Sequence, residues 1–222
     1  MKAALIAGAT GLCGKKLLYS LLNNKEYIRI FILVRKELAI KDSKLTQIVF
    51  NYENEQDYRA IPMADVVFCC LGTTIKKAGS QEAFKKVDLE YPAKLAKTCS
   101  EKGYKKLLII TAVGADKHSS IFYNKIKGET EERIKEHSFE SIYICRPSIL
   151  LGDRADFRIG EEIGKFFAKF GSALFFGSYK KYRAIEASCV SNAMIALANL
   201  DEIGIHVIES DKLQRLGEKV IR

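Results

Sequence analysis

The chain has 222 residues, 48% of them hydrophobic, and its formal net charge is +9. This size and composition are typical of a globular protein with one sizeable core, and they exclude a disordered or membrane-embedded chain. The basic residues come as scattered pairs such as Lys15-Lys16 and Lys105-Lys106. We interpret them as a solvated surface, so we expect neither nucleic acid nor a membrane as a partner.

The cysteines and histidines are spread along the chain without the spacing of a metal site. There is no Cys-x-x-Cys pair, and Cys69, Cys70 and Cys145 fall in apolar runs where cysteine behaves as a small hydrophobe. We therefore expect reduced thiols, no bound metal and a cytoplasmic location. The N-terminal apolar run is short and has no cleavage-like segment, so no signal peptide is predicted.

A glycine turn follows the first predicted strand, residues 3–6, and precedes a predicted helix over residues 15–22. Such a turn lets the backbone approach a ligand, and the start of the helix offers free N–H groups to a pyrophosphate. The strand before it and the helix after it favour a dinucleotide site over an ordinary glycine-rich turn. The cofactor-binding residues predicted here are Gly8, Thr10, Gly11, Leu12, Cys13 and Gly14.

The second predicted strand, residues 27–34, ends at Arg35-Lys36. Dinucleotide sites that prefer NAD(H) place an acidic residue near this position, where it binds the ribose hydroxyls. An arginine can instead bind a 2′-phosphate through charge-assisted hydrogen bonds. We therefore predict NADP(H) as the cofactor, with Arg35 and Lys36 binding it; the alternative is that Arg35 only ends the strand in water.

The next predicted elements are strands at residues 45–50 and 65–72, and a helical stretch over residues 79–103. Pro92 lies inside that stretch and predicts a kink or a junction of two helices. The loop after the second of these strands lies at the carboxyl edge of the sheet, where ligands bind in open α/β folds. Its residues Leu71, Gly72, Thr73 and Thr74 are predicted to line the cofactor, although glycine and threonine also serve simple turns.

A strand at residues 106–113 and a loop at 114–120 precede a charged amphipathic helix at 122–137. Tyr123 and Lys127 are four residues apart and share one face of that helix. A neighbouring ammonium and an oxidised nicotinamide would favour the phenolate, which makes Tyr123 a candidate general acid or base. Lys127 could also hold the nicotinamide ribose. Taken alone, such a pair also fits a core tyrosine beside a solvated lysine.

The last predicted strand of the regular part, residues 141–147, ends at Pro147. The remaining third is less regular: helices are predicted at 161–170, 190–200 and 211–217, and a strand at 205–209. Strands that alternate with helices predict an α/β fold with a parallel sheet. We expect a single-domain, Rossmann-type doubly wound sheet over residues 1–222, in which an irregular region of about 148–222 contributes the substrate side.

Several of these motifs together resemble the short-chain dehydrogenase/reductase superfamily. They are Gly8–Gly14, the strand end at Thr111, the pair Tyr123 and Lys127, and the strand end Arg146-Pro147. Further segments resemble the atypical group around the Tat-interacting-protein oxidoreductases: 71–74, 76–80, 83–88, 114–117, 127–129 and 151–154. The resemblance spans about residues 3–200. It implies a Rossmann-type fold, bound NADP(H), proton transfer by Tyr123, and Pro147, Ser148 and Ile149 near the nicotinamide.

Two positions depart from the pattern of the superfamily. A serine usually holds the substrate oxygen beside the tyrosine, whereas this strand ends Thr111-Ala112, so Thr111, Ser119 or Ser120 must supply the hydroxyl. Many extended relatives have an asparagine early in the helix that follows the cofactor loop, whereas this chain has Val87-Asp88. Both departures concern catalysis and leave cofactor binding untouched.

The sequence therefore predicts an NADP(H)-dependent oxidoreductase that acts on a small carbonyl or alcohol, with Tyr123, Lys127 and Thr111 as catalytic residues. The alternative is a non-catalytic NADP(H)-binding protein, a redox-sensing regulator or scaffold that contacts a protein partner. We expect a monomer or a homodimer with a small-molecule substrate.

Overall fold

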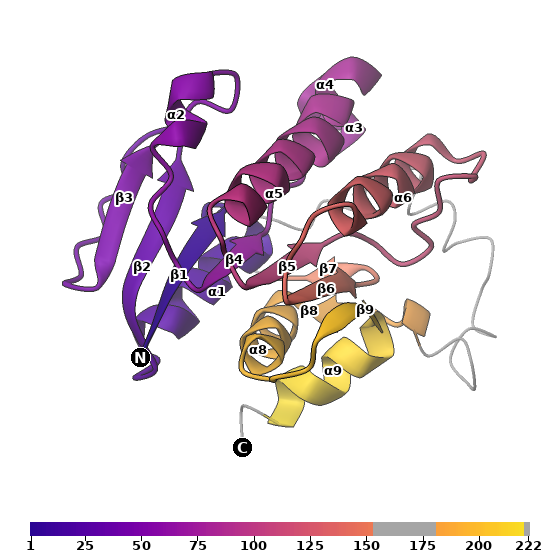
Figure 1. Cartoon of the computed structure of the whole chain (residues 1–222). Coiled ribbons are helices and arrows are strands. Elements are labelled where there is room, and N and C mark those ends of the chain that lie inside the picture. The colour runs from indigo at the N-terminus through magenta and orange to yellow at the C-terminus, as the bar shows by residue number, and fades with distance from the viewer. Residues whose placement is uncertain (153–180, 220–222) are drawn as a thin grey trace.

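A parallel sheet of seven strands forms the centre of the computed structural model, which describes residues 1–152 and 181–219 (Figure 1). The strand order is β3-β2-β1-β4-β5-β6-β9, and every neighbouring pair is parallel. The strands are β1 (Lys2–Ala7), β2 (Tyr27–Val34), β3 (Leu45–Val49), β4 (Val66–Cys69), β5 (Lys106–Ile110), β6 (Ser141–Arg146) and β9 (Gly204–Glu209). This order confirms the predicted Rossmann-type α/β fold.

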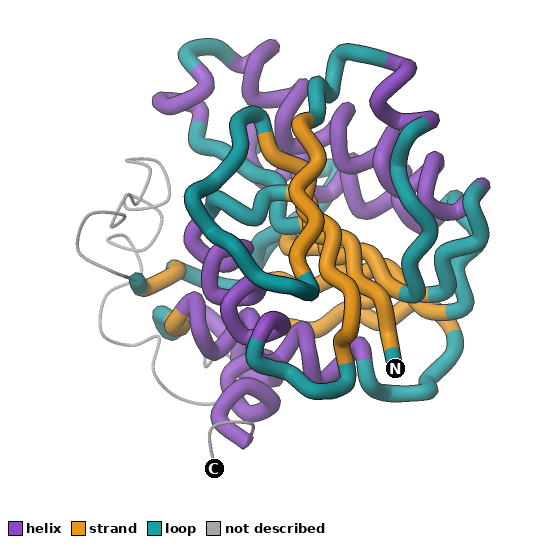
Figure 2. Tube along the Cα trace, turned by 90° about the vertical axis from the view of Figure 1, so that its left-hand side faces the viewer, coloured by secondary structure: helices purple, strands orange, loops and turns teal. Residues whose placement is uncertain are grey.

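Helices cover both faces of the sheet, as the two views show (Figures 1 and 2). One face carries α1 (Leu12–Leu22), α8 (Ala187–Ala198) and α9 (Ser210–Lys219), and the other carries α2 (Glu55–Arg59), α5 (Tyr91–Glu101) and α6 (Phe122–Lys135). A separate short parallel pair joins β7 (Leu150–Leu151) to β8 (Ile185–Glu186). The strand order reverses between β1 and β4, which places a ligand crevice at their carboxyl ends.

The central strands are buried on both faces because their side chains alternate between two cores. In β1, Ile6 packs in the core under α1 and α8, whereas Leu5 packs in the core under α5 and α6. Phe68 and Val67 of β4 alternate in the same way. A strand that is buried on both faces has a continuous run of apolar residues. This run is why β1 and β4 could both be predicted from the sequence.

The stretch predicted over residues 79–103 as a kinked helix or a junction of two helices is three consecutive helical segments. They are α4 (Gln81–Lys85), a single π turn η1 (Lys86–Glu90) and α5, in whose first turn Pro92 lies. The predicted start was wrong, because Gly79 has φ +88° and ends a separate short helix, α3 (Ile75–Ala78). The hydroxyl of Ser80 then accepts a hydrogen bond from the N–H of Ala83 at 3.1 Å and caps α4.

The C-terminal elements follow the prediction closely where the structure describes them. The strand expected at 205–209 is β9, the helix expected at 211–217 is α9, and the helix expected at 190–200 begins three residues earlier in α8. The helix predicted at 161–170 lies outside the described residues. Sequence patterning missed α2, a five-residue helix that Asn54 caps through the N–H of Gln56.

Candidate functional site

The glycine turn after β1 is shaped by two close backbone contacts. Gly8 has φ +84°, and a Cβ atom placed on it would lie 2.4 Å from the carbonyl oxygen of Cys70. A Cβ atom on Gly14 would lie 2.1 Å from the carbonyl oxygen of Gly8. No side chain fits at either position, so these glycines let α1 start directly against β1 and the end of β4.

The start of α1 is open to an anion. Gly11 is the N-cap and provides no capping side chain, and the first turn, Leu12-Cys13-Gly14, contains no acidic residue. The first N–H groups of a helix have no intrahelical acceptor, and the helix dipole favours negative charge there. A turn that has no room for a Cβ atom, followed by such a helix start, fits the pyrophosphate of a dinucleotide.

A cavity of about 370 Å³ opens at this edge of the sheet. Predicted residues that line it are Thr10, Gly11, Leu12, Cys13, Leu71, Gly72, Thr73, Thr74, Thr111, Tyr123, Lys127, Pro147, Ser148 and Ile149. The cavity is also lined by residues that were not predicted from the sequence to bind the cofactor or to take part in catalysis: Cys70, Lys77, Asp88, Ile110, Ala112, Val113, Ile121, Asn124 and Leu150. The glycine turn and the Tyr123 helix therefore face one common space.

Arg35 and Lys36 lie apart from that cavity lining. Both are exposed and directly follow β2, the strand next to β1 in the sheet. They share the carboxyl edge of the sheet with the glycine turn. Their position is therefore open to a ligand that extends from the turn across β2.

Tyr123 lies near the start of α6, and its ring packs 5.6 Å from the ring of Phe84 between their centroids. Burial raises the pKa of Tyr123; the Lys127 ammonium acts against this rise and the Asp88 carboxylate adds to it. The expected influence of the ammonium is present, but burial outweighs it. The Lys127 side chain is only 6% exposed, so the alternative of a solvated lysine is wrong.

Lys127 is held by a buried ion pair with Asp88. The Nζ atom of Lys127 lies 2.7 Å from Oδ1 of Asp88, and the Asp88 side chain is fully buried. Burial acts to lower the pKa of Lys127, but the charge and hydrogen bond of Asp88 together with the Tyr123 side chain outweigh it, so the pKa is raised and the ammonium stays charged. The sequence showed only that Asp88 stands where many extended members of the superfamily have asparagine. The ion-pair partner of Asp88 depends on the packing of two helical segments, η1 and α6.

Thr111 follows β5, and its hydroxyl donates to Oε1 of Glu131 at 2.7 Å. Glu131 also accepts a hydrogen bond from Nε of Arg146 at 2.9 Å, and Nη1 of Arg146 lies 3.3 Å from Oε1 of Glu209. The proposed substitutes Ser119 and Ser120 are absent from the described lining of the cavity. Thr111 is thus the one of these three hydroxyl residues that lines it.

The segment after β6 is fastened to the C-terminal part of the fold. The N–H of Ser148 donates to Oγ of Ser210 at 3.1 Å, and the Ser148 hydroxyl donates to the carbonyl of Arg183. These bonds hold Pro147, Ser148 and Ile149 at the cavity, where the resemblance placed them.

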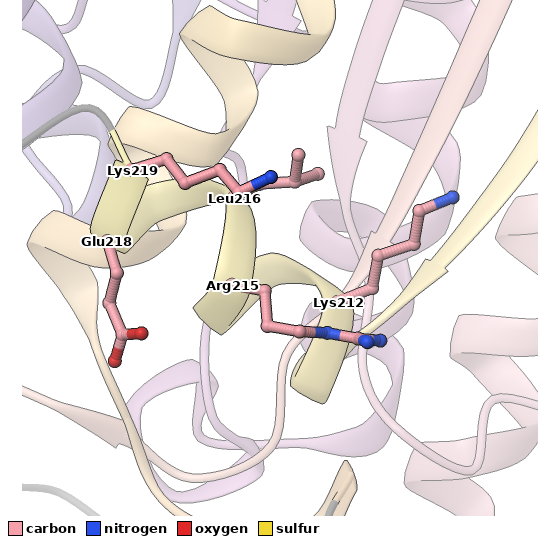
Figure 3. A pocket seen from close by; sticks show the side chains of 5 residues that line it. All are labelled: Lys212, Arg215, Leu216, Glu218 and Lys219. Carbon is pink, nitrogen blue, oxygen red and sulfur yellow. The ribbon is translucent and has the colours of Figure 1, made fainter.

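A second hollow, of about 450 Å³, lies beside α9, which carries all of its described lining residues (Figure 3). Its lining residues are Lys212, Arg215, Leu216, Glu218 and Lys219. None of them belongs to the predicted site. Within residues 1–152 and 181–219, no cluster of three or more His, Cys, Asp or Glu side chains could hold a metal ion. No helix in the same ranges is long and apolar enough to cross a membrane.

A family model described as NAD(P)H-binding matches residues 8–168. The rat protein HTATIP2 is 36% identical over 224 residues, which cover 98% of this chain and 90% of that protein. The mitochondrial protein FMP52 of Eremothecium gossypii is 31% identical over 218 residues and 96% of each chain.

Solved structures of nicotinamide-nucleotide proteins share the fold. MoeE5 in complex with UDP-glucuronic acid and NAD has a TM-score of 0.69 at 16% identity, with 93% of this chain and 75% of that chain covered. The human epimerase family protein SDR39U1 with NADPH has a TM-score of 0.60 at 16% identity, with 99% and 80% covered.

The expected cytoplasmic location is wrong, because the fungal relatives of this chain are named mitochondrial proteins. The six cysteines are free in the structure, as expected. Free thiols indicate a reduced chain but do not distinguish one reducing compartment from another.

Proposed function

Because this chain belongs to the NAD(P)H-binding family and is an HTATIP2-like member of the atypical short-chain dehydrogenases/reductases, we propose that it is an NADP(H)-dependent oxidoreductase. Its reaction transfers a hydride to or from a small carbonyl or alcohol. One observation carries the proposal: Tyr123 and Lys127 line the same cavity as the start of α1. A group that can transfer a proton and a loop that can bind a dinucleotide therefore line the same cavity.

The residues that would hold the cofactor come from three loops at the carboxyl edge. The N–H groups at the start of α1 would bind the pyrophosphate, and the loop of Gly72 and Thr73 would border the ribose. Arg35 and Lys36 would bind the 2′-phosphate through charge-assisted hydrogen bonds. When bound, the nicotinamide supplies the hydride for reduction or accepts it for oxidation.

In the reductive direction, Tyr123 donates its phenolic proton to the oxygen of the substrate as the carbonyl carbon receives the hydride. The products are the alcohol and the phenolate of Tyr123, which takes a proton back from water. In oxidation the phenolate removes the proton from the alcohol. Lys127 stabilises the phenolate by its charge, and Thr111 borders the substrate from the end of β5.

The first experiment is a fluorescence titration of the protein with NADPH and with NADH, followed by turnover on a panel of small carbonyls. We expect tighter binding of NADPH. Tyr123→Phe should lower kcat about 100-fold or more and leave the Kd of NADPH unchanged, because it removes only the proton donor. Tyr19→Phe is the matched control, because Tyr19 is exposed on α1. Failure to bind either nucleotide, or full turnover by Tyr123→Phe, would refute the proposal.

A second candidate function is a non-catalytic NADP(H)-binding regulator or scaffold. It is favoured by the Thr111 hydroxyl, whose hydrogen is committed to Glu131, and by the burial that raises the pKa of Tyr123. The same experiment separates the two functions. Tight NADPH binding without turnover of any carbonyl would support the regulator, which would act as a monomer or homodimer on a protein partner.

A further inference from the structure

Asp88 joins two parts of the proposed reductase site through the two oxygens of one carboxylate. Oδ1 lies 2.7 Å from Nζ of Lys127 on α6, and Oδ2 accepts a hydrogen bond from the N–H of Thr73 at 2.9 Å. The side chain is fully buried. A buried carboxylate is stable only when it is compensated by charged or polar groups; here Oδ1 is paired with the ammonium and Oδ2 receives a backbone hydrogen bond.

The inward position of Asp88 follows from the π turn and from Pro92. The N–H of Tyr91 bonds to the carbonyl of Lys86, five residues earlier, which inserts one residue into the helix. Pro92 has no N–H to offer the carbonyl of Asp88, four residues before it. The hydroxyl of Thr130 on α6 donates to that carbonyl at 2.7 Å instead. The carbonyl of Asp88, left free by the interruption of the helix, is thus hydrogen-bonded to α6, the helix that carries Tyr123 and Lys127.

The cofactor loop passes directly over the ion pair. A Cβ atom on Gly72 would lie 3.4 Å from Oδ1 of Asp88 and 3.7 Å from Nζ of Lys127. Asp88 and Lys127 both line the cavity beside this loop, although their side chains are almost fully buried. The pair therefore lies close to where the loop would border the cofactor.

The charged groups that act on Tyr123 are few. Lys127 lies on the same helix, with Nζ 5.9 Å from the centroid of the Tyr123 ring, and Asp88 acts on Tyr123 from η1. From α4 the ring meets Phe84, which carries no charge. The other charged side chain in the described cavity lining is Lys77 of α3. The cavity thiols, Cys13 and Cys70, are neutral because burial raises the pKa of each.

We propose that Asp88 is a positioning residue that holds the Lys127 ammonium and offsets its charge, so that Tyr123 keeps its proton to higher pH and serves as the acid in carbonyl reduction. This inference rests on the proposed oxidoreductase function. An unpaired Lys127 would favour the phenolate, which is the form needed to oxidise an alcohol. Burial already favours the phenol of Tyr123, and Asp88 adds to that effect, so oxidation of an alcohol requires a higher pH.

The titration of Tyr123 tests the inference without cofactor or substrate. Protein labelled with carbon-13 at the tyrosine Cζ is titrated by NMR, and the Tyr123 signal is assigned by its loss in Tyr123→Phe. In Asp88→Asn we expect the pKa of Tyr123 to fall by about one unit or more, because a nearby negative charge that disfavours the phenolate is removed. Asparagine keeps the size of the side chain and can still accept from the N–H of Thr73.

Two further variants keep the test decisive. Lys127→Gln should raise the pKa of Tyr123, the opposite direction, because it removes the cation and leaves Asp88. Glu90→Gln is the matched control: it removes the same charge from the same π turn at an exposed position, and should leave the titration unchanged. If the pKa of Tyr123 is unchanged or raised in folded Asp88→Asn, the inference is overturned. If that variant does not fold, an unchanged or lowered pKa in Lys127→Gln overturns it.

The activity measurement distinguishes this inference from the proposed function. For a carbonyl that the wild-type protein reduces, Asp88→Asn should move the high-pH limb of the reduction profile to lower pH, because Tyr123 loses its proton earlier. Absence of turnover in the wild type would defeat the proposed function while the NMR titration still reports on the charge coupling. Turnover with an unmoved titration in Asp88→Asn would defeat only the role of Asp88.

Discussion

The hydroxyl of Thr111 donates its hydrogen to Oε1 of Glu131 at 2.7 Å, with both residues buried. A hydroxyl group has one hydrogen to donate, so Thr111 can offer the substrate only its oxygen as an acceptor while this bond lasts. The guanidinium of Arg146 also donates to the Glu131 carboxylate and forms an ion pair with it. Thr111 therefore belongs to a structural network that ties β5 to α6 and, through Arg146, to β9.

Replacing Thr111 by valine should destabilise the fold by about 1–3 kcal/mol, because the buried carboxylate of Glu131 loses a donor while the shape is kept. The free energy of unfolding from urea denaturation measures the loss. Thr111→Ser is the control, since it keeps the hydroxyl and loses only a methyl group. Equal unfolding free energies for wild type and Thr111→Val would show that the bond contributes nothing.

Two glycines with positive φ allow the cost of the close contact at Gly8 to be separated from the cost of the left-handed backbone conformation. Gly8 and Gly79 have similar positive φ values, +84° and +88°, but a Cβ atom meets Cys70 only at Gly8 and has nothing within 4 Å at Gly79. Gly79→Ala should cost about 1–2 kcal/mol for the left-handed conformation. Gly8→Ala should cost about 1–3 kcal/mol more, because the backbone of Cys70 must move.

The measurements are thermal unfolding and nucleotide binding for both variants. Gly8→Ala should weaken NADPH binding, since the turn that borders the pyrophosphate moves, whereas Gly79→Ala should bind normally. Equal stability and equal nucleotide affinity in the two variants would show that the contact with Cys70 does not shape the turn.

Local patterns located most of the fold, because buried parallel strands and amphipathic helices leave periodic signals in the sequence. The spacing of Tyr123 and Lys127 was enough to place both on one face of a helix. The partner of Lys127 was not predictable in this way. It depends on a π turn and on contacts between residues 88 and 130, which are remote in sequence. The predicted cytoplasmic location was wrong because it was inferred from reduced thiols, which occur in more than one cellular compartment.

Lys77 lines the cavity from α3, while its neighbour Lys76 is exposed and lies outside the described lining. A cation at that position attracts the negative charges of a nucleotide or an anionic substrate. Lys77→Ala should weaken NADPH binding about two- to fivefold at low salt, the size expected for an exposed charge, and the difference should shrink at high salt. Lys76→Ala should bind as the wild type. Equal losses in both variants would indicate a general charge effect and no specific contact.

Arg35 provides the test of cofactor preference, because it is exposed at the end of β2 on the edge of the sheet that carries the glycine turn. If its guanidinium binds the 2′-phosphate, Arg35→Ala should weaken NADPH binding about 10- to 100-fold, the loss of about 1.5–3 kcal/mol expected for a hydrogen bond to a charged group. NADH has no 2′-phosphate, so its Kd should not change. Arg29→Ala is the matched control, since Arg29 is an exposed arginine of the same strand. Titrations of wild type and both variants with each nucleotide measure these affinities, and an unchanged ratio of NADPH to NADH affinity in Arg35→Ala would remove Arg35 from the binding site.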